Sequence, residues 1–123
     1  MAQTGPGPWQ EWRAFLEQGR FMLQRSASSG EHVFYPRVAA PGSGAQDLEW
    51  VEASGAGVVY ATTIVRKKPP EPSYSVVLVD LAEGPRLMSE VVGIPPEEVT
   101  IGMSVTARID GEGSEARLVF VAR

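Results

Sequence analysis

The sequence predicts a mainly β protein with an N-terminal helix, an irregular middle module and a small C-terminal barrel. A length of 123 residues fits one domain with at most a small appendage. The 13 glycines and 10 prolines favour short strands and many turns over a helix bundle. Short runs rich in β-branched residues follow one another after residue 48. We therefore expect a tail and helix at 1–20, a module at 21–47 and the barrel at 48–123.

The helix is expected in the segment "WQEWRAFLEQG", which follows Pro8 and ends at Gly19. Trp9, Trp12 and Leu16 fall on one helical face, so that face is apolar and aromatic. So short a helix is marginal alone and must pack on something. Two possibilities stay open: docking on its own domain, and docking on a partner subunit. Exposed tryptophans at 9 and 12 would favour a homodimer or hetero-oligomer.

The sequence of the C-terminal part predicts five or six short antiparallel strands with one brief helical connection. The proline pair in "IPPEEVTIG" excludes a continuous strand there and favours a short helical turn. The size and order of these elements match the five-stranded OB type of closed barrel. The expected strands lie in "LEWVEAS", "VVYATTIVRKK", "YSVVLVDL", "RLMSEVVG", "MSVTARID" and "ARLVFVAR".

Composition narrows the classes of function. The absence of cysteine excludes disulfides and thiolate metal sites, and it leads us to expect a cytoplasmic protein. No apolar run is long enough to cross a bilayer, and the first residues do not resemble a secretion signal. The net charge is −4; residues 1–45 hold four Arg against three Glu, whereas residues 46–123 hold seven Lys or Arg against twelve Asp or Glu. An acidic barrel is a poor match for a nucleic acid.

No set of residues marks a self-contained catalyst. His32 is the single imidazole, and we interpret it as an ordinary histidine. Glu97 and Glu98 are adjacent, so they point in different directions on a helical turn and are expected to be solvated. No nucleophilic triad or phosphate-binding glycine loop is recognisable, and we expect no enzymatic activity of the isolated chain.

Two short motifs each allow a structural and a functional interpretation. The cluster "RKK", Arg66, Lys67 and Lys68, is either a charged strand end that protects an edge or a cationic handle for the phosphates of a coenzyme. The motif "FYPR", residues 34–37, is either a small core that joins the N-terminal module to the barrel or the lining of a ligand groove or partner interface. Both alternatives remain open for each motif.

Four blocks of the chain resemble the DUF35 family, whose members join a rubredoxin-like zinc ribbon to an OB-fold barrel. The resemblance extends from about Trp12 to Phe120. The blocks are "GRFMLQR" (19–25), "FYPR" (34–37), "LEWVEASGAGVVYATTIV" (48–65) and "VVLVDLAEGPRLMSEVVGIPPEEVTIGMSV" (76–105).

The resemblance implies a zinc ribbon that has lost its ligands. Typical members carry two Cys-x-x-Cys pairs, which fall here on Ser26 and Ser29 and on Ala40 and Ser43. Neither serine nor alanine suits zinc at neutral pH, so we expect no metal. The module is then either ordered by apolar packing or mobile until a partner binds. The packing residues would be Phe21, Leu23, Val33, Phe34, Tyr35 and Val38.

The resemblance further implies a non-catalytic accessory subunit that binds acyl-CoA or serves as a scaffold. The partner would be a thiolase-like enzyme, a related aldolase or a MaoC-type hydratase of lipid or steroid acyl-CoA metabolism. A nucleic-acid-binding OB-fold protein is the alternative. On the first hypothesis, the phosphates would meet Arg37, Arg66, Lys67 and Lys68, and the apolar walls would be Phe34, Tyr35 and Trp50.

Overall fold

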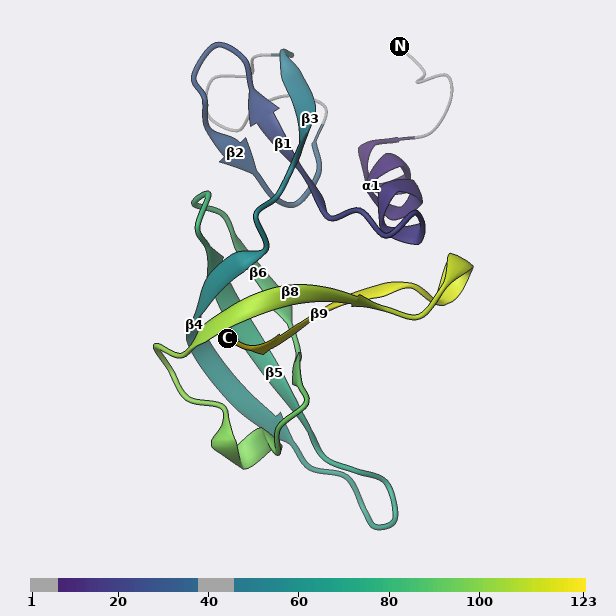
Figure 1. Cartoon of the computed structure of the whole chain (residues 1–123), viewed down its shortest axis with the longest axis vertical. Coiled ribbons are helices and arrows are strands. Elements are labelled where there is room, and N and C mark those ends of the chain that lie inside the picture. Colours follow the sequence, from purple (N-terminus) through teal and green to yellow (C-terminus); the bar gives the residue numbers. More distant parts are fainter. Residues whose placement is uncertain (1–6, 38–45) are drawn as a thin grey trace.

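A computed structural model describes residues 7–37 and 46–123 and shows one helix and two sheets (Figure 1). Helix α1 (Pro8–Glu17) precedes a three-stranded antiparallel sheet in the order β2-β1-β3. The strands of this sheet are β1 (Met22–Ser26), β2 (His32–Val33) and β3 (Leu48–Glu52). We call α1 and this sheet the helix–ribbon unit.

The second sheet has six strands in the order β6-β5-β4-β8-β9-β7. These are β4 (Ala56–Val65), β5 (Tyr74–Leu81), β6 (Arg86–Ser89), β7 (Val91–Val92), β8 (Ser104–Asp110) and β9 (Arg117–Ala122), with 3-10 turns η1 (Pro96–Glu98) and η2 (Gly113–Glu115).

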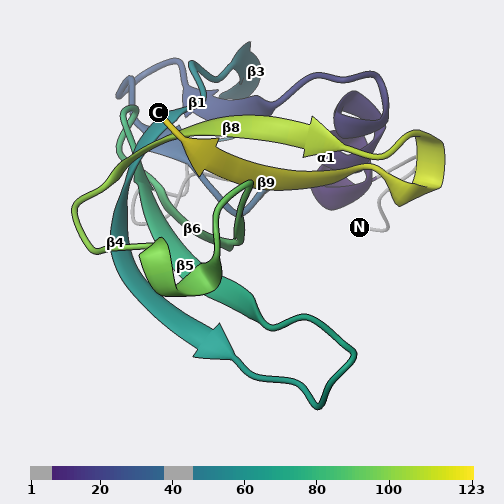
Figure 2. The same cartoon turned by 60° about the horizontal axis from the view of Figure 1, so that its bottom comes forward.

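The six-stranded sheet curls into a closed barrel (Figure 2). Only Glu90 separates β6 from β7, so the two act as one bent strand. Its first part pairs antiparallel with β5, and its second part pairs parallel with β9, which closes the sheet. The short helical turn η1 then leads towards β8, as the proline pair predicted. This order of elements confirms the predicted mainly β class with an OB-fold barrel.

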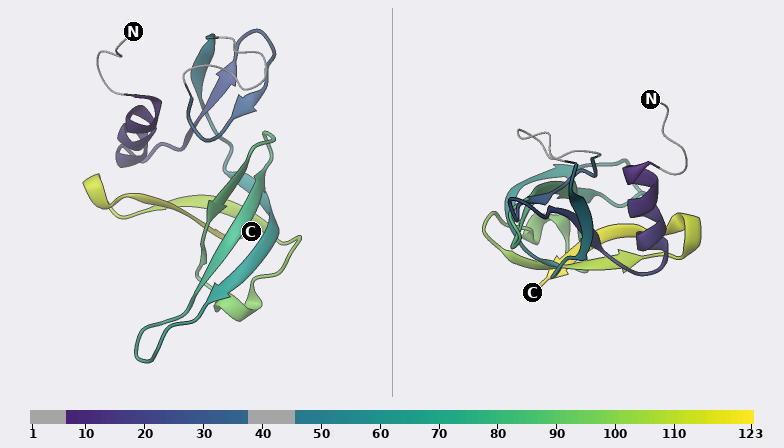
Figure 3. Two further views of the ribbon diagram at one scale, coloured as in Figure 1. Left: turned by 180° about the vertical axis from the view of Figure 1, so that it is seen from behind. Right: turned by 90° about the horizontal axis from the view of Figure 1, so that it is seen from above.

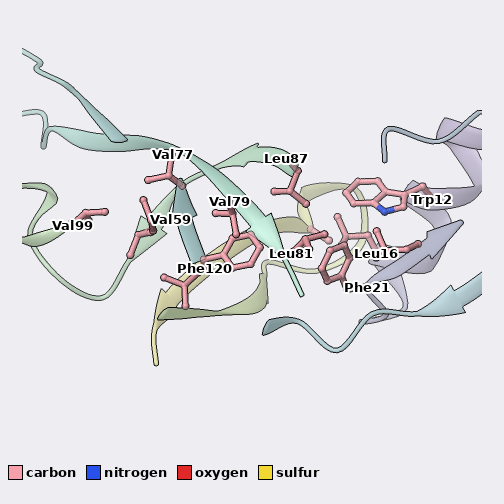
Figure 4. Packing of buried hydrophobic residues seen from close by; sticks show 14 residues of the cluster. Trp12, Leu16, Phe21, Val59, Val77, Val79, Leu81, Leu87, Val99 and Phe120 are labelled. Carbon is pink, nitrogen blue, oxygen red and sulfur yellow. The ribbon is translucent and has the colours of Figure 1, made fainter. Parts of the chain in front are cut away.

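Partly exposed and buried residues alternate strictly along β5, and the buried ones fill the barrel. Ser75, Val77, Val79 and Leu81 are buried, whereas the residues between them are partly exposed. Figure 4 shows Val77 and Val79 beside Phe120 of β9, which is 0% exposed. At Gly57 a Cβ atom would lie 2.5 Å from Cγ1 of Val79, so only glycine lets β4 pass this close to β5. The barrel core is therefore built from valine, leucine and phenylalanine side chains on one face of a curved sheet.

Strand β3 belongs to the helix–ribbon unit by its pairing. It pairs along its whole length with β1, from Met22 opposite Glu52 to Ser26 opposite Leu48. The sequence pattern placed residues 48–52 in the barrel because they read as the first of several consecutive strands. Periodicity identifies a strand but does not say which neighbour it pairs with, and the barrel strands begin at Ala56.

Helix α1 docks on its own chain. Trp12 and Leu16 are buried, and Nε1 of Trp12 donates a hydrogen bond to the carbonyl oxygen of Met22 at 3.0 Å. The guanidinium of Arg13 donates to the carbonyl oxygens of Ala116 (2.6 Å) and Ser114 (3.2 Å) in the β8–β9 turn. The expected exposure of Trp12 was therefore wrong, because the indole finds its polar partner inside the fold. In the described ranges, no helix is both long and apolar enough to span a membrane.

Candidate functional site

An aromatic face lies where α1 meets the loop after β2. It consists of Trp9, Trp12, Phe34 and Tyr35, and we use the name for these four residues. Trp9 stacks on Trp12 with ring centroids 5.1 Å apart, and it approaches Tyr35 at 6.5 Å. Phe34 contacts both Trp12 (5.5 Å) and Tyr35 (4.5 Å). Trp9 is 50% exposed and Tyr35 is 48% exposed, so the outer half of the face is open to solvent.

A buried glutamine fixes the loop that carries Tyr35. Gln24 of β1 is 5% exposed, and its Nε2 donates to the carbonyl oxygen of Arg37 at 2.7 Å. The backbone N–H of Arg37 in turn donates to Oε1 of Gln24 at 2.6 Å. Both ends of the buried amide are satisfied, which favours a single loop position. Tyr35 is thus held at the surface by β1, and the exposed Arg37 lies two residues further along the loop.

Trp50 of β3 packs on the other aromatic residue of α1. Its ring lies edge-on to Phe15 at 5.3 Å, and its Nε1 donates to Oε2 of Glu11 at 2.8 Å. A carboxylate next to this indole disfavours a coenzyme phosphate there. Trp50 is therefore placed to join β3 to α1, while Phe34 and Tyr35 share the aromatic face.

The cationic cluster lies at the opposite end of the molecule. Arg66, Lys67 and Lys68 follow β4 and begin the β4–β5 loop, which projects from the barrel on the side away from the helix–ribbon unit (Figures 1 and 3). Arg66 lies 3.7 Å from Glu97, and Lys67 lies 3.8 Å from Glu71. The seven residues predicted to contact acyl-CoA therefore form two groups: Phe34, Tyr35, Arg37 and Trp50 at one end, and the cluster at the other.

A hydrogen-bonded turn at residues 26–30 stands where the first Cys-x-x-Cys pair of a zinc ribbon would lie, and we call this turn the knuckle. The buried hydroxyl of Ser26 donates to Oδ1 of Asp47 at 2.9 Å, and the backbone N–H of Ser28 donates to Oδ2 at 2.7 Å. The N–H of Ser29 donates to Oγ of Ser26 at 3.4 Å, and the N–H of Gly30 donates to the carbonyl oxygen of Ser26 at 2.8 Å. Hydrogen bonds from Ser28 and Ser26 hold the pKa of Asp47 below its ordinary value. The ionised carboxylate therefore joins the turn after β1 to the residue that precedes β3.

These donors do not fit zinc. The hydroxyl of Ser26 is already bonded to Asp47, and hydroxyls are poor zinc ligands beside thiolate or imidazole. Among residues 7–37 and 46–123, no three His, Cys, Asp or Glu side chains gather where they could hold a metal ion. Ala40 and Ser43, the second expected pair, lie outside the described residues, as does Val38. Of the other expected packing residues, Phe21, Leu23 and Val33 are buried, Phe34 packs against the core and Tyr35 does not.

The strand tyrosines that a nucleic acid could stack on carry cations on their rings. The guanidinium of Arg86 lies 3.4 Å from the ring centroid of Tyr60, and the ammonium of Lys67 lies 5.8 Å from that of Tyr74. Arg86 is also paired with Asp80 at 2.6 Å. Single-strand binding needs free ring faces beside a basic groove. Each of these cations already faces a carboxylate, which weakens the nucleic-acid alternative.

Two residues of this region escaped prediction, and a third was predicted only in part. Trp9 was expected on the apolar helix face with an exposed ring, but its contact with Tyr35 was not expected. Gln24 and Asp47 act through hydrogen bonds to residues 13 and 21 positions away in the sequence. No local pattern marks such partners.

Comparison with known proteins gives one family model and several similar proteins. A family model described as the C-terminal OB-fold domain of ChsH2 matches residues 50–110. The chain is 40% identical over 98 residues to a probable enoyl-CoA hydratase alpha subunit from Thermomonospora curvata; the match covers 76% of this chain and 30% of that relative, or less than a third of its length.

Two further matches cover most of this chain and most of the matched protein. A DUF35 domain-containing scaffold protein from Pyrococcus furiosus is 34% identical over 98 residues, covering 76% of this chain and 71% of that protein. A chain of the solved structure named Ltp2-ChsH2(DUF35) aldolase superposes with a TM-score of 0.83 at 32% identity, over 98% of each chain.

Proposed function

The chain belongs to the DUF35 family, and from that premise we propose that it is a non-catalytic accessory subunit of an acyl-CoA enzyme complex. The observation that carries the proposal is the match over 98% of both chains to a chain of the Ltp2-ChsH2(DUF35) aldolase. Names of the relatives favour a hydratase or an aldolase as the catalytic partner. A thiolase-like or MaoC-type enzyme of lipid or steroid metabolism is the finer form of this proposal.

The aromatic face is the surface that we assign to this role. Trp9 and Tyr35 expose about half of their surface. Exposed Trp and Tyr are typical of the residues that dominate protein interfaces. The loop is held in place by Gln24, so little ordering is needed when a partner or an acyl-CoA binds. Arg37 in the same loop supplies a cation for a phosphate.

The residues predicted to contact acyl-CoA lie in two separate groups, so the hypothesis of one acyl-CoA site has to be revised. The aromatic face with Arg37 is one contact region, and the cluster Arg66–Lys68 is another on a projecting loop. A cationic cluster this far from the aromatic face suits a separate contact with the catalytic subunit or with the phosphates of a ligand held by that subunit. We further propose that the helix–ribbon unit folds without zinc, because the hydroxyl of Ser26 already donates a hydrogen bond to Asp47.

Co-purification tests the proposal. The tagged chain is co-expressed in turn with a thiolase-like enzyme, an aldolase and a MaoC-type hydratase, and the mass of each complex and its turnover of acyl-CoA esters are measured. We expect one stable complex whose turnover depends on this chain, with no turnover by the chain alone. Turnover by the isolated chain, or no complex with any of the three classes, would contradict the proposal.

A double variant locates the contact. Trp9→Ala with Tyr35→Ala should weaken the complex roughly tenfold or more, because exposed aromatic anchors contribute most of an interface's energy. Ile101→Ala is the matched control, since Ile101 is 69% exposed on the barrel. An unchanged affinity of the double variant would remove the aromatic face from the interface.

A low-salt titration with single-stranded DNA and RNA should show no binding. Saturable binding would favour the alternative hypothesis of a nucleic-acid-binding OB-fold protein.

A further inference from the structure

A groove separate from the aromatic face lies between the end of α1, the β3–β4 connection and the end of β8. It has a volume of about 840 Å³. Leu16 and Phe21 lie beneath it and are buried, so the apolar surface that a ligand could reach comes from the partly buried Ala53, Ala107 and Ile109. The sequence pattern did not indicate this groove, because its walls come from three separate segments of the chain.

The rim of the groove is acidic. Glu17, Glu52 and Glu112 line it together with a single cation, Arg20. Arg20 is already engaged, since its guanidinium lies 3.4 Å from Glu52 and over the ring of Phe15 at 5.3 Å. Within the described part of the chain, neither Glu17 nor Glu112 forms an ion pair. Two carboxylates are therefore left without a counter-charge around an apolar floor.

Two further features place negative potential at the same groove. Glu17 lies at the C-terminal end of α1, whose last turn holds no basic residue. The unpaired carbonyl groups of a helix end carry a partial negative charge, so a glutamate there is unfavourable and a cation is favoured. Beside the groove, Ser54 donates its N–H to Oε2 of Glu83 at 2.6 Å, while the buried Oε1 of Glu83 has no hydrogen-bond partner among the described residues.

We propose that this groove receives an arginine- or lysine-bearing segment of the partner subunit, with an apolar side chain on the floor and basic groups on the rim. The inference rests on the proposed function, because it identifies the occupant as part of the catalytic partner. Charge complementarity selects this occupant: the rim repels the phosphates of an acyl-CoA and attracts a cationic peptide. The long aliphatic stem of a basic side chain also covers apolar surface while its charge stays at the rim.

Three glycines make the groove observable in solution. Gly19, Gly55 and Gly111 line it, and glycine amides are well separated in a ¹⁵N-correlated NMR spectrum. The labelled full chain is titrated with the probe peptide acetyl-Ala-Arg-Leu-Arg-Ala-amide at low salt. The control peptide replaces both arginines with glutamate. We expect saturable shifts of these three amides with the basic peptide only, and weaker binding as salt rises.

A matched pair of variants tests the rim. Glu17→Gln with Glu112→Gln should weaken binding of the basic peptide roughly 2- to 30-fold, as expected for two exposed ion pairs. Glu31→Gln with Glu98→Gln changes the net charge equally at exposed sites away from the groove and should leave the affinity unchanged. The proposal would be overturned if both pairs of variants lost affinity for the basic peptide equally, or if the acidic peptide shifted the glycine amides. It would also be overturned if spermidine shifted these amides as strongly as the basic peptide does.

The complex with the catalytic subunit separates this inference from the proposed function. If the complex forms and Glu17→Gln with Glu112→Gln weakens it while the control pair does not, the groove is part of the interface. If the complex forms with equal affinity for both pairs, the groove proposal fails and the accessory function stands. If no catalytic subunit binds the wild-type chain, the proposed function fails, and the occupant we assign to the groove fails with it.

Discussion

The barrel and the helix–ribbon unit achieve their stability by different means. The barrel is a closed sheet whose interior is a stack of alternating apolar side chains, among them Val77, Val79 and Phe120. The three-stranded sheet of the helix–ribbon unit is open. It is held by α1, by the buried Phe21 and Leu23, and by hydrogen bonds that Gln24 makes with Arg37 and that Asp47 accepts. Alternating burial is enough to build the closed barrel, whereas the open ribbon adds individual side-chain hydrogen bonds to its apolar packing.

The largest expected effect comes from the barrel. Phe120→Ala should lower the free energy of unfolding by about 3–5 kcal/mol, because it leaves a cavity in a fully buried site. Chemical denaturation followed by far-ultraviolet circular dichroism measures the change. A loss below about 1 kcal/mol would mean that the barrel does not control the stability of the whole chain.

A smaller effect is expected at the contact between α1 and the ribbon. Trp12→Phe removes the donor to the carbonyl oxygen of Met22 and should lower the free energy of unfolding by about 1–3 kcal/mol, the cost of a buried unpaired polar group. Trp9→Phe on the same helix is the control, because Trp9 is half exposed. Denaturation curves for the two variants should separate clearly; similar curves would show that the indole hydrogen bond contributes little.

A local effect is expected in the knuckle. Asp47→Asn removes the charge that accepts hydrogen bonds from Ser26 and Ser28, so the amides of Ser28 and Gly30 should exchange with deuterium faster while barrel amides do not change. Because the pKa of Asp47 is lowered in the fold, its contribution is present above the unfolded pKa and is lost as pH falls.

Asp80→Asn on the barrel surface is the control and should leave the knuckle unaffected. A chelator should not change either exchange pattern, and metal analysis should find no zinc. One bound equivalent of zinc would contradict the substitution of hydrogen bonds for metal.

The smallest effect on stability is expected at the projecting loop. Replacing Arg66, Lys67 and Lys68 with glutamine should change the free energy of unfolding by less than about 0.5 kcal/mol, because their ion pairs are exposed. Thermal denaturation measures this change. A larger loss would favour the interpretation of this cluster as a structural strand end, whereas a loss of acyl-CoA-dependent turnover in the complex alone would favour the cationic handle.

Periodic features were predictable and long-range pairs were not. The apolar run at residues 74–81 and the proline pair at 95 and 96 predicted a strand and a helical turn, because each depends on local sequence. The pairing of β3 with β1, the bond between Ser26 and Asp47 and the contact of Trp9 with Tyr35 depend on how separate segments meet. For the same reason the sequence could not reveal that the two groups of predicted acyl-CoA residues lie at opposite ends.

The three tryptophans have a practical consequence. They occupy positions 9, 12 and 50, so all of the indole fluorescence of the chain originates in α1 and β3 and none in the barrel strands. Circular dichroism, by contrast, reports on α1 and on the strands of both sheets together. Indole fluorescence therefore follows the helix–ribbon unit alone, beside a signal from the whole chain. Different midpoints for the two signals would reveal a chain whose helix–ribbon unit opens while the barrel stays folded.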